Sequence, residues 1–239
     1  MKTLAIHSYK GGTGKTFLAI NLAAQLVELG KETVLLELDF DAPSLKTTLG
    51  IEAEKWTNDV LIRGVNIEEA LVSINNFKVA LSNPSIEEIN KVASLRKTEY
   101  MRVLGRLLRA LKKLEREGID YVIIDTSPGV SLMTINSIAA SDVVLLVMRE
   151  DDIDISGTKN MIEGIYDVLG KEVYIVLNRV LRKENKEKIE RELNIEVISE
   201  IRCSCDVPLW KGKIFSIENR DHPVSVGIRE LSEKLISLG

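Results

Sequence analysis

The feature that most restricts how this 239-residue chain can fold is a glycine-rich loop between an apolar segment and an amphipathic one. Residues 3–8 predict a short β-strand, and the loop Lys10-Gly11-Gly12-Thr13-Gly14-Lys15-Thr16 follows. Apolar residues then recur at helical spacing as far as Leu29, and Gly30 is typical of a helix end. In a strand–loop–helix turn, backbone N–H groups converge on an anion and the helix start adds about half a positive charge. The loop therefore predicts a phosphate-binding site.

Further apolar segments alternate with helical patterns along the rest of the chain. They predict strands at residues 33–38, 121–124, 143–148, 173–177 and 195–201. Strands that are apolar on both faces and alternate with helices imply a parallel sheet covered on both sides. We expect an α/β fold with a doubly wound, mainly parallel sheet flanked by helices, formed by residues 1–239 as a single domain.

The segment from residue 51 to 95 has a less regular pattern. It predicts a short helix near Ile67–Ile74, an edge strand at Phe77–Leu81 and another helix after Asn83-Pro84-Ser85. The sequence does not say where these elements join the sheet.

Composition excludes several classes of protein. With 45% hydrophobic and 28% charged residues the chain is globular, and a net charge of −4 argues against a surface that binds nucleic acid all over. No apolar run approaches the roughly 18 to 20 residues needed to span a bilayer. We therefore expect a cytoplasmic protein without integral membrane association. Two cysteines, Cys203 and Cys205, are spaced too closely for an unstrained disulfide on a strand.

Acidic residues follow two of the predicted strands. Asp39 and Asp41 come just after residues 33–38, and an extended backbone would point both toward the carboxyl end of the sheet, where ligands bind. The alternative is a pair of capping or surface aspartates before Pro43. Asp125 ends the strand at 121–124, where a carboxylate suits Mg²⁺ held through water, and the Thr16 hydroxyl is placed to bind the same ion.

The loop departs from the strict GxxxxGK[ST] pattern because Tyr9 stands where the first glycine belongs. It matches the variant KGGxGK[ST] in full, and with this loop the chain resembles the ParA/MinD family of P-loop ATPases over about residues 1–50 and 118–239. The resemblance implies a P-loop NTPase fold, ATP and Mg²⁺ as ligands, and slow ATP hydrolysis. It also implies an ATP-dependent homodimer that acts as a switch on a protein partner in partitioning or positioning.

The resemblance further implies three catalytic residues. Lys10 would cross the dimer interface to the partner's nucleotide, Lys15 would reach the terminal phosphates, and Asp41 would orient the attacking water. Asp39 would lie near the Mg²⁺ shell with Thr16 and Asp125 as metal ligands, although the division of roles between Asp39 and Asp41 stays open.

The same resemblance predicts the residues that contact the nucleotide. Thr126-Ser127-Pro128-Gly129 resembles a second switch, in which the Gly129 N–H turns toward the γ-phosphate. Asn178 would read the adenine edge, with backbone contacts from residues 201–208. The full predicted set is Gly11, Gly12, Thr13, Gly14, Lys15, Thr16, Phe17, Asn178 and Arg179.

Residues 96–117 predict an amphipathic helix with an apolar face of Met101, Leu104, Leu108 and Leu111. The opposite stripe is basic and consists of Arg102, Arg106, Arg109, Lys113 and Arg116. This stripe is either a solvated helix face or a contact for DNA, an acidic partner or anionic lipid.

Two other functions remain open at this point. One is a nucleotide-gated scaffold or metal-cluster carrier with little turnover, in which Cys203 and Cys205 bridge a metal between two chains, although their Cys-Ser-Cys spacing differs from CxxC. The other is a ParA-like, ATP-dependent, non-specific DNA binder in segregation, acting through the basic stripe.

Overall fold

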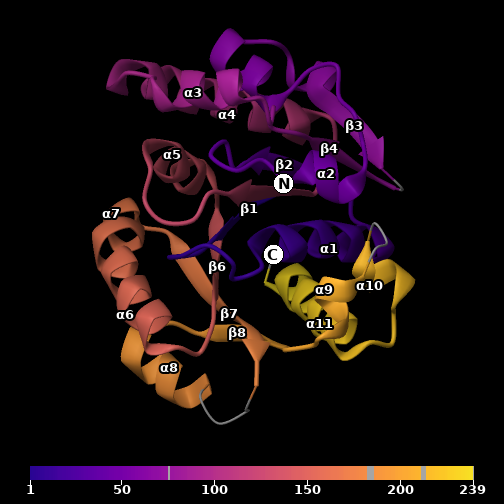
Figure 1. The fold of residues 1–239 in the computed structure, drawn as a ribbon, viewed down its shortest axis with the longest axis vertical. Helices are drawn as coiled ribbons and strands as arrows, with labels where there is room; N and C mark the ends of the chain where they lie inside the picture. Colours follow the sequence, from indigo (N-terminus) through magenta and orange to yellow (C-terminus); the bar gives the residue numbers. More distant parts are fainter. Residues whose placement is uncertain (75, 182–185, 211–213, 239) are drawn as a thin grey trace.

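The computed structural model describes residues 1–74, 76–181, 186–210 and 214–238. Its described strands form one eight-stranded sheet in the order β3-β4-β2-β5-β1-β6-β7-β8, with helices on both faces (Figure 1). Neighbouring strands are parallel except β3 and β4, which are antiparallel. The expected doubly wound, mainly parallel α/β fold is confirmed.

The predicted strands of the central sheet are all present, within a few residues of their expected ends. The strands are β1 Lys2–His7, β2 Thr33–Leu38, β3 Leu71–Ile74, β4 Phe77–Ala80, β5 Tyr121–Thr126, β6 Val143–Met148, β7 Glu172–Val180 and β8 Val197–Arg202.

The helices connect these strands on both sides of the sheet. They are α1 Lys15–Glu28, α2 Leu45–Leu49, α3 Ile86–Ala93, α4 Lys97–Arg116, α5 Leu132–Ala140, α6 Asp152–Met161, α7 Asp167–Leu169, α8 Lys186–Leu193, α9 Asp206–Leu209, α10 Phe215–Glu218 and α11 Pro223–Ser237, with the irregular turns η1 Asp59–Arg63, η2 Ile67–Ala70 and η3 Ile162–Tyr166.

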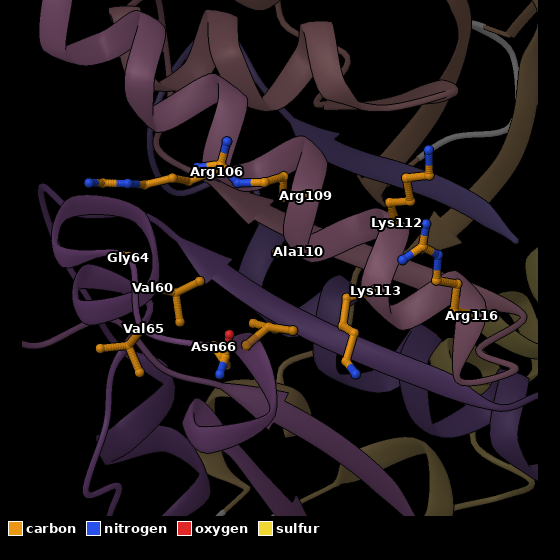
Figure 2. A pocket seen from close by; sticks show the side chains of 11 residues that line it. Val60, Gly64, Val65, Asn66, Arg106, Arg109, Ala110, Lys112, Lys113 and Arg116 are labelled. Carbon is orange, nitrogen blue, oxygen red and sulfur yellow. The ribbon is translucent and has the colours of Figure 1, made fainter.

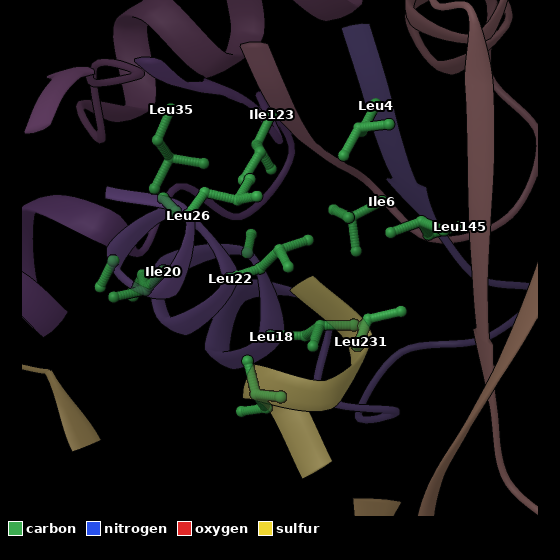
Figure 3. Close-up of a cluster of buried hydrophobic side chains, with 14 of the residues drawn as sticks. Leu4, Ile6, Leu18, Ile20, Leu22, Leu26, Leu35, Ile123, Leu145 and Leu231 are labelled. Carbon is green, nitrogen blue, oxygen red and sulfur yellow. The ribbon is translucent and has the colours of Figure 1, made fainter. Parts of the chain in front are cut away.

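The core is divided by the sheet into two layers. On one face α1 and α11 pack together, and Figure 3 shows Leu18, Leu22 and Leu26 of α1 close to strand side chains such as Ile6 and Ile123. On the other face α4 and α5 cover β2 and β5, while α6, η3 and α8 cover β6 and β7. Because each central strand is buried on both faces, its sequence is mainly apolar rather than alternating.

This strand order positions the functional loops. β5 lies between β2 and β1, so the carboxyl ends of these three parallel strands lie side by side. The glycine loop follows β1, Asp39 follows β2 and Asp125 lies near the end of β5. Segments far apart in the sequence are therefore brought to one edge of the sheet, where doubly wound folds bind their ligands.

The prediction of a helix near Ile67–Ile74 is wrong for the second half of this segment. Only η2 is helical, and Leu71–Ile74 forms β3, an antiparallel edge strand paired with β4. β4 is consequently the second strand of the sheet rather than its edge. Leu71–Ile74 pairs with the strand that follows it in the sequence, so strand pairing overrode a short and weak helical pattern. The predicted helix after Ser85 is present as α3, and Ser85 caps it.

The apolar face assigned to the helix at 96–117 is also wrong. In α4 the buried side chains are Val103, Leu107, Ala110, Leu111 and Leu114. Met101 is 66% exposed and Leu108 is 48% exposed, so of the predicted apolar face only Leu111 is buried. Leucines occur around much of this helix, and packing against β2, β5 and η1 selected which of them are covered.

Two adjacent leucines of α4 test this assignment. Leu107 is 1% exposed, and Leu107→Ala is expected to lower the free energy of unfolding by about 2–5 kcal/mol through lost burial and a residual cavity. Leu108→Ala, its matched control, is expected to change it by less than about 1 kcal/mol. Urea unfolding measures both, and a larger loss for Leu108→Ala would restore the face predicted from the sequence.

Candidate nucleotide-binding site

The glycine loop holds Lys15 at the start of α1. Gly12 and Gly14 have φ values of 77° and 96°, which side chains rarely adopt. A Cβ on Gly14 would also collide with the Asn178 amide, so the loop packs tightly against the end of β7. Lys15 is buried, and its Nζ donates a hydrogen bond of 3.0 Å to Ser8 Oγ. Burial lowers the pKa of Lys15, whereas the charges of Asp125 and Asp39 raise it.

Thr16 and Asp125 form a pair beside this lysine. Thr16 Oγ1 donates a hydrogen bond of 2.7 Å to Asp125 Oδ2, while Asp125 Oδ1 is buried without a hydrogen-bond partner among the described residues. Burial raises the pKa of Asp125 to about 7. The hydrogen bond from Thr16 lowers it, and the charges of Glu37 and Asp39 raise it further. A buried carboxylate with one orphaned oxygen next to a hydroxyl fits Mg²⁺, which prefers oxygen ligands.

The loops after β2 and β5 meet at Asp39. Asp39 Oδ1 accepts a hydrogen bond of 2.7 Å from Ser127 Oγ and one of 3.0 Å from the Ala42 N–H. Asp41 is exposed, and no hydrogen bond or ion pair of its side chain is found within the described ranges. The hydrogen bond from the Ala42 N–H closes a turn after Asp39, so Asp39 is held inside the site while Asp41 lies at the surface.

Glu37 is a buried carboxylate of this region that sequence reasoning missed. It accepts hydrogen bonds from the backbone N–H groups of Ser44, Leu45 and Ser82, which hold the loop after β2 against the end of β4. Burial raises its pKa to about 6. A single charge inside the apolar strand Thr33–Leu38 was the signal that could have revealed it.

His7 was also missed, and it holds the loop after β5. Its Nε2 donates a hydrogen bond of 2.8 Å to the Gly129 carbonyl, and its Nδ1 accepts one of 2.6 Å from the Tyr166 hydroxyl. Burial lowers the pKa of His7 to about 4, so the ring is neutral. The Gly129 N–H, predicted to face the γ-phosphate, donates here to the Ser8 carbonyl at 2.9 Å.

Lys10 points to its own chain. Its Nζ lies 2.7 Å from Asp151 Oδ1 and 3.4 Å from Asp154 Oδ1, at the N-terminus of α6. The hydrogen bond to Asp151 raises the pKa of Lys10. The acidic run that follows β6 is a sequence signal for this contact, because the carboxyl end of β6 lies next to that of β1.

The residues predicted for the base surround one pocket of about 430 Å³ next to the glycine loop. Asn178 Nδ2 donates a hydrogen bond of 2.7 Å to the Thr13 carbonyl. Arg179, with φ of 59°, comes next in the chain and also lines the pocket. Gly14 and Phe17 from α1 form another wall. Cys203 and Cys205, both exposed free thiols, line the same pocket. In the described part of the chain no group of three or more His, Cys, Asp or Glu could hold a metal ion.

The fold and this site define a P-loop NTPase: a doubly wound sheet with a glycine loop, a buried lysine and a Thr–Asp pair at its carboxyl edge. A family model described as AAA domain matches residues 1–181. The chromosome-partitioning ATPase Soj of Thermus thermophilus is 27% identical over 168 residues, which cover 70% of this chain and 63% of Soj.

Solved structures share the whole fold. The cell-division ATPase MinD of Pyrococcus furiosus superposes with a TM-score of 0.85 at 20% identity, covering 100% of this chain and 99% of MinD. MinD of Pyrococcus horikoshii, solved with Mg-ADP, superposes with a TM-score of 0.83 at 19% identity, covering 99% of this chain and 96% of that MinD. The chain belongs to the ParA/MinD family of P-loop ATPases.

Within the residues that the structure describes, every helix is too short or too polar to cross a membrane.

The raised pKa of Asp125 gives a pH prediction. Between about pH 3.8 and 7 the folded protein binds this proton more tightly than the unfolded chain, so the stability of the nucleotide-free protein falls as pH rises. Asp125→Asn is expected to reduce this slope, because its neutral amide removes the titration. Thermal unfolding across this range measures the effect.

The exposed Asp221 supplies a control, since Asp221→Asn is expected to keep the wild-type slope. Stabilisation by Mg²⁺ with nucleotide should in contrast grow as pH rises toward 7, because the metal needs the ionised carboxylate. If Asp125→Asn left the change of stability with pH as it is in the wild type, that result would contradict the raised pKa of Asp125.

Proposed function

We propose that this chain binds Mg-ATP, hydrolyses it slowly, and uses the cycle as a homodimeric switch that times the binding of a protein partner. The observation that carries the proposal is the Thr16–Asp125 pair beside the buried Lys15. A hydrogen bond of 2.7 Å joins Thr16 to Asp125, and one of 3.0 Å joins Lys15 to Ser8, so both side chains are held in place at the phosphate end of the site. Each side chain has the chemistry that a triphosphate and its cation require.

ATP as the nucleotide is supported by the neighbouring pocket. Its volume suits a base and ribose, and Asn178 offers an amide edge next to the Thr13 carbonyl. One similar structure, MinD of Pyrococcus horikoshii, was solved with Mg-ADP. Arg179 and the Phe17 ring would flank the base in the same pocket.

Hydrolysis requires charge compensation and an oriented water. In this proposal Lys15 and the loop N–H groups bind the β- and γ-phosphates, and Asp41 orients the attacking water. Thr16 and Asp125 hold Mg²⁺, with Asp39 near its shell. When bound, the ion neutralises charge on the phosphate oxygens. Asp41 is exposed, so its carboxylate is accessible to a water molecule from solvent.

Dimerisation is supported by the position of Lys10. Because its ammonium group is paired with Asp151 and Asp154, it does not contribute to the phosphate site of its own chain. Its side chain is about one quarter exposed, so the ion pair is partly screened by water and inexpensive to break. A partner's triphosphate would offer Lys10 a denser negative charge than two aspartates.

Lys15→Ala tests nucleotide binding. Loss of the buried ammonium is expected to weaken Mg-ATP binding about 10- to 100-fold or more, and turnover with it. Isothermal titration with a non-hydrolysable analogue measures the affinity. Binding at wild-type affinity would reject the site itself.

Lys10→Ala tests the contribution in trans. It is expected to leave nucleotide affinity within about threefold of wild type while lowering turnover about 10³-fold or to background. Phosphate release and mass measurement with and without ATP report turnover and dimerisation. Lys188→Ala, which removes an exposed lysine of α8, is the matched control and should behave as wild type.

The scaffold alternative gives a different pattern. A nucleotide-gated carrier would bind ATP and change its oligomeric state with negligible phosphate release from the wild-type protein. Hydrolysis unaffected by Lys10→Ala would instead leave ATPase activity in place and remove the role of Lys10 in trans.

A further inference from the structure

A second pocket, of about 380 Å³, lies between α4 and the segment at residues 60–67. In Figure 2 its cationic side chains all come from α4, and Val60, Gly64, Val65 and Asn66 come from the facing segment. Five cationic residues line it: Arg106, Arg109, Lys112, Lys113 and Arg116. No acidic residue is among its described lining.

The positive charge of this pocket is only partly balanced by the chain. Lys113 is paired with Glu68 at 2.8 Å, and Arg106 donates to the backbone carbonyls of Leu61 and Ile62. Arg109, Lys112 and Arg116 have no ion pair or side-chain hydrogen bond in the described ranges. The chain as a whole carries −4, so three uncompensated cations around one concavity are a local excess that favours an anion.

The pocket wall is ordered by Arg106 and Gly64. Arg106 donates hydrogen bonds to the carbonyls of Leu61 and Ile62 in η1, and η1 ends at Gly64, whose φ of 86° favours a residue without a side chain. A Cβ at this position would lie 3.5–3.7 Å from the guanidinium atoms. Arg106 is therefore fixed as a structural part of the wall, and the other cations are left for a ligand. Asn66, on the same wall, adds an amide without a side-chain hydrogen bond in the described structure.

The pocket is separate from the nucleotide site. α4 ends at Arg116, just before β5 begins at Tyr121, so Arg109–Arg116 lies toward the amino ends of the strands. The glycine loop and Asp125 lie at the carboxyl ends. The two pockets have no lining residue in common.

We propose that this pocket is a second binding site, for a small ligand that carries at least two phosphate groups. Guanidinium groups bind phosphate oxygens through paired hydrogen bonds, which favours phosphate over isolated carboxylates. Arg109 and Arg116 are seven residues apart, about 10 Å along the helix, so together they match several linked phosphates better than one. The volume is that of a small-molecule site, and a duplex is too wide to enter it.

The test uses inorganic tripolyphosphate, pyrophosphate and orthophosphate as probes, titrated calorimetrically. The P-loop site is first saturated with Mg²⁺ and a non-hydrolysable ATP analogue, so that binding there does not contribute. We expect affinity to fall in that order of probes. Arg109→Ala/Arg116→Ala is expected to weaken tripolyphosphate binding at least about tenfold.

The matched control is Lys97→Ala/Arg102→Ala, which removes two exposed cations from the same helix outside the pocket. It should leave tripolyphosphate affinity within about twofold. Circular dichroism and retained binding of the ATP analogue show that both variants are folded. An equal loss of tripolyphosphate affinity in both double variants would indicate general attraction to positive charge and overturn the proposal.

Two further outcomes would overturn it. Tripolyphosphate that fails to bind once the P-loop site is filled would leave the pocket without a phosphate ligand. Duplex DNA that binds through Arg109 and Arg116, when tripolyphosphate neither binds nor competes, would assign these residues to nucleic acid instead. If the P-loop site itself does not bind nucleotide, the same titrations on the Lys15→Ala variant still test this pocket independently.

Discussion

The nucleotide site depends on an imbalance of buried charge at the carboxyl edge of the sheet. Three buried carboxylates, those of Glu37, Asp39 and Asp125, act on one another here, and the ammonium group of Lys15 interacts with two of them, Asp39 and Asp125. Their charges are partly compensated by hydrogen bonds from backbone N–H groups, Thr16 and Ser127. Burying carboxylates in excess of cations is costly, and the raised pKa values of Glu37 and Asp125 express that cost. A divalent cation would lower this cost by compensating the carboxylate charge, so the buried carboxylates favour Mg²⁺ binding.

The same edge is held together by contacts between the loops that follow the strands. Gly129 is fixed through both its N–H and its carbonyl, by Ser8 and His7, and Lys10 is fixed by the first turn of α6. These contacts all lie within one chain, and they join loops that follow different strands of the sheet. The loop after β1 is thereby connected to the loops after β5 and β6.

The sequence predicted the parts of the fold and site that depend on local pattern. The loop from Lys10 to Thr16, the apolar strands and the aspartate at the end of β5 are each visible in a few consecutive residues. The errors occurred where packing chooses among equivalent residues: β3 was taken as helix, and the apolar face of α4 was rotated toward Met101 and Leu108. The contacts that were missed, such as His7 with Tyr166, join residues 159 positions apart, which no local pattern reveals.

By itself, the sequence determined that a phosphate-binding turn follows the first strand, because the positions of the glycines restrict the backbone geometry there. It also determined that the chain forms a doubly wound sheet, because the periodicity of apolar residues indicates which strands are buried. Only the tertiary structure decided which carboxylates share the environment of Lys15, that Asp41 is exposed, and that Lys10 pairs with Asp151. Those outcomes depend on which strands become neighbours and on how loops pack at their ends. Charges and hydrogen-bond donors from distant segments act on one another only when the folded sheet brings them within a few ångströms.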